Sequence, residues 1–172
     1  MTTQWPSQSI YARVDIAEGT CVLTYDKLNV GQIIESVGDH RAGATAVFIG
    51  TTRNSFKGKV VTRLDYQAYS KLAIKTMADI VRTVHGTYTR SDHHPENSNP
   101  SVIRSAVHHR LGTVAVGEPS IVIAVSSPHR KEAFIACEAI LEEVKLKAQI
   151  WKREFYEGER EEDAEWKANA SG

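Results

Sequence analysis

The sequence lacks any apolar run long enough to cross a lipid bilayer, which takes about 20 consecutive apolar residues. Its polar start, MTTQWPSQS, also lacks the apolar stretch of a secretory signal peptide, so we expect a cytoplasmic protein. Cysteine is scarce as well. Cys21 and Cys137 lack the CxxC spacing of zinc and redox sites, and neither has the setting of a sulfur carrier.

An excess of charge of either sign is absent too. Lys+Arg and Asp+Glu number 21 each, so no global field draws the molecule to nucleic acid or to a membrane. Anion binding must therefore depend on a local basic cluster. The sequence contains no GxSxG, Walker-type or GxGxxG motif, so the usual marks of serine hydrolases, nucleoside triphosphatases and Rossmann proteins are missing.

What the chain does contain is a mixture of short strands and long amphipathic segments, in a length that suits one well-packed domain. Apolar alternation and short apolar runs predict strands, and a 3.6-residue apolar repeat predicts helices. The expected strands are 10–16, 20–25, 44–49, 60–69, 102–111, 120–125 and 149–155, and the expected helices are 30–37, 71–85 and 127–147. This mixture favours a single α+β domain over residues 1–172 with a largely antiparallel sheet.

Two segments differ from the rest in composition. Residues 87–100 (TYTRSDHHPENSNP) are rich in Ser, Asn, Asp and Pro, so we expect a mobile loop there. Residues 157–172 form an acidic C-terminal tail, with six acids between Glu157 and Glu165. Such a charge run is typically solvated, although Trp166 suggests that the tail docks onto the domain.

The helix expected at 127–147 has the clearest start. Ser127 is a good N-cap and Pro128 suits the first helical position. Its expected buried stripe is Phe134, Cys137, Leu141 and Val144.

His129 and Arg130 fall in the first turn of this helix, where unpaired backbone N–H groups and the helix dipole favour an anion. A cation there is unfavourable for the helix itself, so a bound phosphate or carboxylate would explain it. The alternative is that Arg130 pairs with Glu132 or another surface acid. The residues alone leave both explanations open.

Other cations lie close to the ends of expected strands. Lys145 and Lys152 flank the turn after the long helix, and neighbouring cations can make a lysine a usable base or nucleophile. A solvated helix C-terminus is the simpler explanation of these lysines when they are taken alone. Arg53 follows an apolar strand in the loop 51–59, from which it could reach a ligand, but loop arginines are more often simply solvated.

The histidines raise the question of a metal site. His93 and His94 lie in the expected mobile loop, and His85 lies near a helix C-terminus, where positive charge is tolerated. His108 and His109 are consecutive on an expected strand, so they point to opposite faces and cannot easily share a metal ion. We predict no metal site.

Four segments occur together in an order that is more specific than any single motif: IGTTRN (49–54), HHRLG (108–112), SSPHR (126–130) and KLKAQIWKRE (145–154). In this order and spacing the chain resembles the large, catalytic subunit of molybdopterin synthase, the MoaE family, over roughly residues 43–169. The resemblance implies an alpha/beta-hammerhead type of fold, with two main helices and a small accessory sheet. One departure is Gln149, which stands where many relatives have proline and could loosen the turn.

The resemblance also implies a sulfurtransferase of molybdenum cofactor biosynthesis. Members of this family transfer two sulfurs to cyclic pyranopterin monophosphate, which yields the dithiolene of molybdopterin. The sulfur arrives as a thiocarboxylate on the C-terminal Gly-Gly of a small ubiquitin-like partner subunit. The large subunit forms a homodimer within a heterotetramer, and no resident cofactor, nucleic acid or membrane is implied.

Matching positions imply roles for five residues. Lys145 and Lys152 match the catalytic lysines, and we expect Lys145 to act nearest the chemistry, as a base or as a transient covalent partner for the donor's acyl group. Lys152 and Arg53 would orient the thiocarboxylate or stabilise developing negative charge. His129 and Arg130 would hold the substrate phosphate, with His129 a possible proton donor.

Helix geometry separates these groups. His129 and Lys145 are sixteen residues apart, which is roughly 24 Å along a straight helix at ~1.5 Å per residue. One small pterin cannot readily bridge that gap. We therefore hypothesise a composite site, in which Lys145, Lys152 and Arg53 come from one subunit and the His-Arg pair comes from its dimer mate.

Two other functions stay open on the sequence alone. A non-catalytic module that binds a phosphorylated metabolite or a partner's C-terminal tail would keep Arg53, His129 and Arg130 but would not require Lys145. A metal-dependent hydrolase would use the histidines, which the strand geometry of His108 and His109 disfavours.

Overall fold

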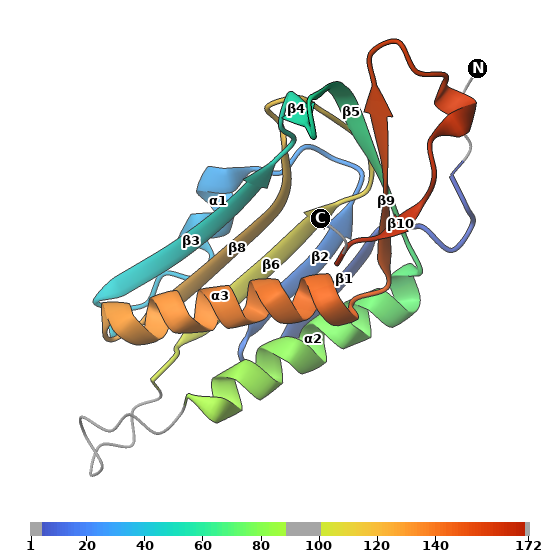
Figure 1. Ribbon diagram of the computed structural model, residues 1–172. Coiled ribbons are helices and arrows are strands. Elements are labelled where there is room, and N and C mark those ends of the chain that lie inside the picture. Colours follow the sequence, from blue (N-terminus) through green and yellow to red (C-terminus); the bar gives the residue numbers. More distant parts are fainter. Residues whose placement is uncertain (1–4, 89–100, 171–172) are drawn as a thin grey trace.

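The first of two sheets forms the centre of the fold in the computed structural model, which describes residues 5–88 and 101–170 (Figure 1). Its strands lie in the order β1 (Ala12–Ile16), β2 (Gly19–Thr24), β6 (Arg104–Arg110), β8 (Pro119–Ser127) and β3 (Ala44–Thr51). All neighbours pair antiparallel except β2 and β6. The predicted α+β class with a largely antiparallel sheet is confirmed.

The second sheet is built around β5 (Lys59–Ala68) and β9 (Ile150–Tyr156), which pair antiparallel. The short strands β4 (Ser55–Phe56), β7 (Gly112–Ala115) and β10 (Lys167–Ala168) complete it. The sequence prediction of a plain loop over 51–59 was wrong, because β4 and β5 form a hairpin. Lys57 and Gly58 connect these strands with φ values of 50° and 77°, the positive-φ pair that a tight two-residue hairpin turn requires.

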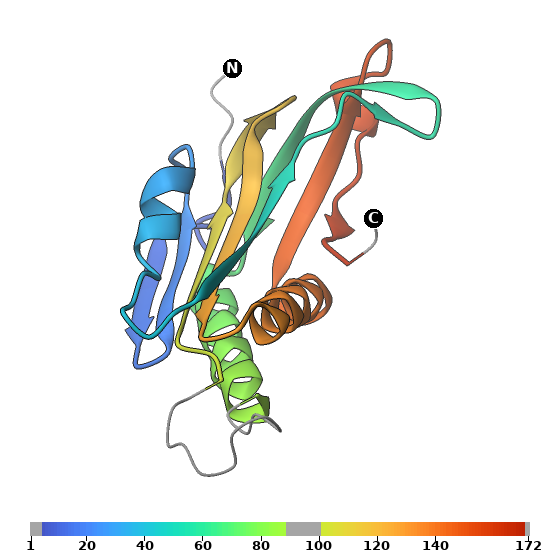
Figure 2. The same cartoon turned by 90° about the vertical axis from the view of Figure 1, so that its left-hand side faces the viewer.

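Helices cover both faces of the first sheet (Figure 2). The short helix α1 (Val30–Glu35) lies on one face, and the long helices α2 (Ser70–Thr87) and α3 (Arg130–Lys147) lie on the other. Strand β8 alternates accordingly: Val122 and Ala124 pack with α1, whereas Ile123 and Val125 belong to the core under α2 and α3. This confirms the prediction that an apolar run on both faces lies centrally in a sheet.

Helix α3 begins later than the sequence predicted. Ser127 is the last residue of β8, where its hydroxyl donates to the carbonyl of Ser101 at 2.5 Å, and Pro128 precedes the helix. His129 is the N-cap and makes no side-chain cap bond. Ser127 and Pro128 therefore match a capping pattern in sequence, but the strand pairing of Ser127 with Ala44 keeps it in the sheet.

The buried stripe of α3 also differs in part from the prediction. Cys137 and Val144 are buried as expected and Leu141 is partly buried, but Phe134 is 66% exposed. The stripe is made by Ala133, Ala136, Cys137, Ile140 and Val144, a spacing that keeps one helical face on the sheet. Small residues at its start let α3 lie close to β3 and β8, and the large Phe134 falls beside that face.

The turn between α3 and β9 is tied to α2 through Gln149. Its side-chain oxygen accepts a hydrogen bond from the hydroxyl of Thr76 at 3.0 Å, and its carbonyl accepts from the backbone N–H of Tyr69 at 3.0 Å. Gln149 therefore ties this turn to α2 through its side chain and its backbone.

The end of α2 overlaps the loop that the sequence predicts at 87–100. Helix α2 extends to Thr87, so the first residue of the expected loop 87–100 is helical, and residues 89–100 lie outside the described part of the chain.

Within residues 5–88 and 101–170, no helix combines the length and apolar character needed to cross a membrane.

We predict that Ile140→Ala lowers the free energy of unfolding by about 2–5 kcal/mol, because Ile140 is fully buried where α3 meets the sheet. Leu146→Ala is the matched control on the same helix, since Leu146 is 68% exposed. Urea denaturation should show a change below about 0.5 kcal/mol for the control. Equal destabilisation by both variants would contradict this packing of α3.

Candidate functional site

Three of the predicted site residues line one cavity of about 160 Å³. Arg53 follows β3, Lys145 lies in the last turn of α3, and Lys152 lies on β9. These elements are far apart in the sequence, and the pairing of β5 with β9 brings them together. The sequence expectation that Arg53, Lys145 and Lys152 form one group agrees with this arrangement.

Lys152 is a largely buried cation of the cavity. Only 12% of its side chain is exposed, and burial lowers its pKa below the usual lysine value. The positive charges of Lys145 and Lys167 lower this pKa further, whereas Glu154, with a carboxylate oxygen 3.6 Å from Nζ, opposes the shift. Lys152 therefore gives up its proton more readily than a solvated lysine does.

Glu154 is a site residue that the sequence analysis missed. It lines the same cavity, with only 9% of its side chain exposed, and it accepts a hydrogen bond from the hydroxyl of Tyr156. Burial first, and then this carboxylate, raise the pKa of Tyr156 to about 12. The signal was present in the sequence, because Lys152, Glu154 and Tyr156 alternate along one strand and must share a face.

Arg53 reaches the cavity from an exposed position beside the β4–β5 hairpin. Its guanidinium carbon lies 5.7 Å from the centre of the Phe56 ring, and the Lys57 ammonium lies 5.2 Å from the same ring. Cation–π contacts of this kind hold a cation without neutralising it. Arg53 can therefore present a positive charge at the mouth of the cavity.

His129 and Arg130 line a separate groove of about 560 Å³ at the other end of α3. Gly43 forms part of its wall and lies so close to the Pro128 carbonyl that an added Cβ would stand 2.5 Å from the oxygen. Lys131 adds a second permanent cation beside Arg130 at this helix N-terminus, and Glu132 is the one acid among the described residues of the lining. The groove therefore concentrates positive charge where backbone N–H groups already favour an anion.

The structure does not bring the two groups of cations together within one chain. Arg130 and Lys145 lie near opposite ends of a single continuous helix, so at ~1.5 Å per residue they are roughly 22 Å apart. The intramolecular separation expected from the sequence is thus present in the fold.

The two cysteines are unsuited to carry sulfur in the resting protein. Both are buried and unpaired, and burial raises the pKa of Cys21 to about 12 and that of Cys137 to about 11. The thiolate is the reactive form of cysteine. Little thiolate therefore exists at neutral pH.

Among the described histidines, His85 and His109 are buried and His108 is partly buried, whereas His40 and His129 are exposed. His85 shares a 2.7 Å hydrogen bond with Ser105, and burial lowers its pKa. A positive charge on His85 is therefore disfavoured, although its place near a helix C-terminus would tolerate one. Burial also lowers the pKa of His108 and of His109 to about 4. No cluster of three potential metal-binding side chains occurs in the described ranges, and His93 and His94 lie outside them.

Comparison with known proteins gives one consistent result. A family model described as "MoaE protein" matches residues 23–147. "Molybdopterin synthase catalytic subunit 2" of Aedes aegypti is 43% identical over 147 residues, covering 86% of this chain and 87% of that protein. The molybdopterin synthase catalytic subunit of Pyricularia oryzae is 44% identical over 163 residues, covering 92% and 80%. The crystal structure of molybdopterin synthase from Staphylococcus aureus superimposes with a TM-score of 0.72 at 30% identity, covering 84% and 94%.

We predict that Glu154→Gln lowers the pKa of Lys152 further, because the substitution removes the negative charge that opposes the shift and leaves the side-chain shape unchanged. Lys152 should then react with an amine-acylating reagent at lower pH than in the wild type, as peptide mass spectrometry over a pH series can measure. Glu143→Gln is the control, since Glu143 pairs with the exposed Lys147. An unchanged or higher midpoint for Lys152 would be incompatible with this electrostatic account.

Proposed function

The chain belongs to the MoaE family, and on this premise we propose that the protein is the catalytic subunit of a molybdopterin synthase. It is a sulfurtransferase of molybdenum cofactor biosynthesis, acting in the cytoplasm as a single large-subunit domain. Its relatives at 43–44% identity carry the name of this subunit. The observation that carries the proposal at the level of chemistry is the convergence of Arg53, Lys145 and Lys152 in one cavity.

The sulfur donor in this proposal is the C-terminal thiocarboxylate of a small ubiquitin-like partner subunit. A thiocarboxylate is an anion on a flexible tail, so it needs a narrow opening lined by cations. Arg53 and Lys152 orient that anion or stabilise developing negative charge. The buried, high-pKa thiols of Cys21 and Cys137 agree with a sulfur that arrives on a partner.

Lys145 acts nearest the chemistry, as a base or as the group that transiently accepts the donor's acyl carbon. The lowered pKa of Lys152 adds a second candidate for the neutral amine. Two adjacent ammonium groups repel each other, so the loss of a proton from one favours the charged form of the other. One lysine can therefore stay cationic and bind the anion while the other is neutral and reactive.

His129 and Arg130 hold the phosphate of cyclic pyranopterin monophosphate in a composite site. Because Arg130 and Lys145 are roughly 22 Å apart on one helix, a small substrate reaches both groups only if they come from different subunits. A homodimer, carrying one small subunit at each end in a heterotetramer, satisfies that requirement.

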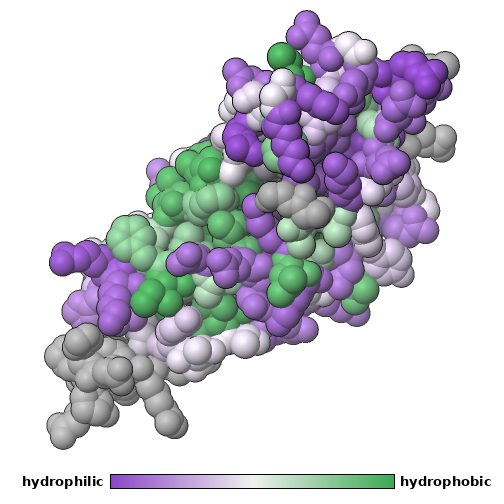
Figure 3. All heavy atoms as spheres, in the orientation of Figure 1, coloured by the Kyte–Doolittle hydropathy of each residue, from purple (hydrophilic) through white to green (hydrophobic). Residues whose placement is uncertain are grey.

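Apolar surface near this groove supports a second copy of the chain as the neighbour. Figure 3 shows a hydrophobic area over β3, beside the start of α3. On this edge strand, Val47 and Ile49 are 37% and 42% exposed on the side that faces α1, and Phe134 of α3 is 66% exposed one turn after Arg130. Burial of such surface is the main favourable term in most protein association.

We predict that the wild-type protein, supplied with cyclic pyranopterin monophosphate and a thiocarboxylated small subunit, produces the dithiolene of molybdopterin. Lys145→Ala should lower turnover at least about 100-fold while the small subunit still binds, because only the reactive amine is lost. Lys147→Ala is the control, since Lys147 is an exposed cation in the same turn. If the wild type makes no product where a known synthase does, a non-catalytic binding module becomes the better assignment.

Mixed dimers test the composite site. Homodimers of Lys145→Ala and of Arg130→Ala should both be inactive, whereas purified heterodimers of the two should regain about half of the wild-type turnover, because one of their two sites is intact. Product formation is the measurement. Verified heterodimers with no recovery would contradict the composite site.

A further inference from the structure

The C-terminal segment after β9 folds back along that strand. Strand β10 pairs antiparallel with β9, which places Lys167 opposite Lys152 and Ala168 opposite Trp151. The Trp166 ring lies 4.6 Å from the Arg153 guanidinium carbon and 6.5 Å from the ring centre of Trp5. The docking suggested by this tryptophan in an acidic tail is therefore present.

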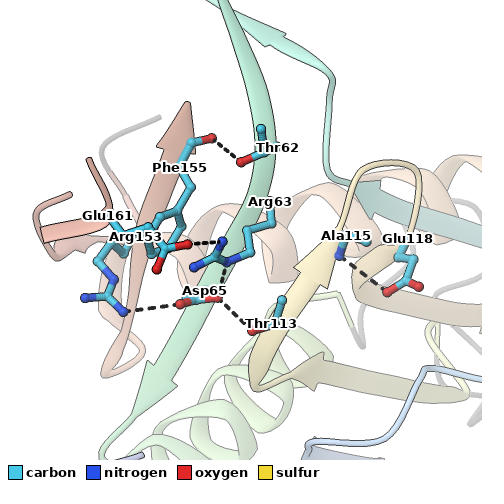
Figure 4. Close-up of polar contacts among 9 residues, drawn as sticks. All are labelled: Thr62, Arg63, Asp65, Thr113, Ala115, Glu118, Arg153, Phe155 and Glu161. Atoms are coloured by element: carbon cyan, nitrogen blue, oxygen red, sulfur yellow. Dashed lines mark hydrogen bonds and ion pairs between the residues drawn. The ribbon is translucent and has the colours of Figure 1, made fainter. Parts of the chain in front are cut away.

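A charged cluster under the segment strengthens the attachment (Figure 4). Asp65 is 1% exposed and accepts hydrogen bonds from Thr113 at 2.9 Å and from Arg153 at 3.2 Å. Arg63 stacks 3.8 Å from the Phe155 ring centre and donates to Glu161 of the segment at 2.9 Å. Arg63 and Arg153 thus connect the buried carboxylate on β5 to the C-terminal segment.

This attachment delivers Asn169 to the lysine cavity. Asn169 is 7% exposed, its backbone N–H donates to the Ile150 carbonyl at 3.2 Å, and it lines the cavity with Lys145 and Lys152. Its side-chain nitrogen lies 3.4 Å from Nε2 of His109, which lines the same cavity. The C-terminal segment therefore places a buried amide beside the candidate catalytic groups.

The hydrogen bonds of His109 decide which of its nitrogens carries the proton. Nδ1 lies 2.7 Å from the Arg110 carbonyl, and a carbonyl oxygen only accepts, so Nδ1 must donate. The ring is fully enclosed and stacks edge-on against Tyr66 at 4.9 Å between centres. A neutral ring with its proton on Nδ1 has a lone pair on Nε2, and the Asn169 amide N–H group faces that lone pair.

We propose that Asn169, delivered by the C-terminal segment, is a positioning residue that holds His109 neutral with its proton on Nδ1, as an uncharged wall of the lysine cavity. An N–H donor on Nε2 competes with a proton for the same lone pair, so it disfavours imidazolium. The charged and titratable groups around the cavity are Lys145 from α3, Tyr66 from β5, Lys152 and Glu154 from β9, and Arg53. An imidazolium there would add a cation beside Lys145, whose charge already acts on His109.

The role of Asn169 in catalysis rests on the proposed function, but its effect on the protonation of His109 can be tested without it. NMR of protein with ¹⁵N-labelled histidine should show His109 neutral and protonated on Nδ1 in the wild type from pH 5 to 8. Asn169→Asp replaces the donor by an acceptor and should raise the titration midpoint of His109 by about one to three pH units. Asn169→Ala should raise it by less. Glu162→Ala, an exposed change in the same segment, should leave it unchanged.

Either of two NMR results overturns the proposal. The first is a wild-type His109 that carries its proton on Nε2 or is charged at neutral pH. This measurement uses the wild-type protein alone, so it does not depend on the folding of any variant. The second is an unchanged midpoint in both Asn169→Ala and Asn169→Asp. Trp166→Ala gives a second route, because it should loosen the segment with Asn169 intact and shift His109 in the same direction.

Activity supplies the catalytic arm. In Asn169→Ala the acid limb of the pH–turnover profile should move to higher pH by the same amount as the titration midpoint of His109. A rise of one unit in the pKa of His109 from about 4 should roughly halve turnover at pH 5 relative to turnover at pH 8. A purely structural role would lower turnover equally at all pH values, and that result would also overturn the proposal. An inactive wild type would instead refute the proposed function and leave the NMR result to decide the role of Asn169.

Discussion

The packing of one continuous helix, α3, against the first sheet is the constraint on which the rest of the structure depends. The helix is buried along Ala133, Ala136, Ile140 and Val144, so it can neither bend nor shift along the sheet without opening the core. Its two ends carry the two groups of candidate functional cations. The fold therefore fixes their separation, and a substrate smaller than that separation requires a second chain.

Strand pairing in the second sheet buries charged residues that would otherwise be solvated. Lysine and glutamate on an isolated strand would be solvated, but the pairing of β9 with β5 and β10 leaves Lys152 and Glu154 with little exposed surface. Loss of water destabilises the ammonium form of a lysine, and the adjacent carboxylate offsets only part of that destabilisation. A chain with equal numbers of acids and bases can in this way concentrate cations locally without a net charge.

The C-terminal segment connects stability with function. Its acidic residues are mostly solvated, yet Glu161 and Trp166 engage Arg63 and Arg153, which also surround the buried Asp65. Buried charge is tolerated only when it is paired and hydrogen-bonded. Arg63 and Arg153, which pair with Asp65, therefore also hold the segment in the place where Asn169 reaches His109.

Local patterns in the sequence determined which segments are helices and which are strands, because apolar periodicity reflects which faces are buried. This periodicity alone predicts β8, α2 and most of the other strands. Motif order determined the family and the choice of Arg53, Lys145, Lys152, His129 and Arg130, whose individual roles stay predictions. Only the tertiary structure decided that Phe134 is exposed, that Ser127 stays in a strand and that the 51–59 segment is a hairpin, since each depends on partners distant in sequence. The same holds for His109 and Asn169, and for the burial of Glu154, although strand alternation alone places Glu154 on the same face as Lys152. Their chemistry comes from loss of water and from one another, and no local pattern records those contacts.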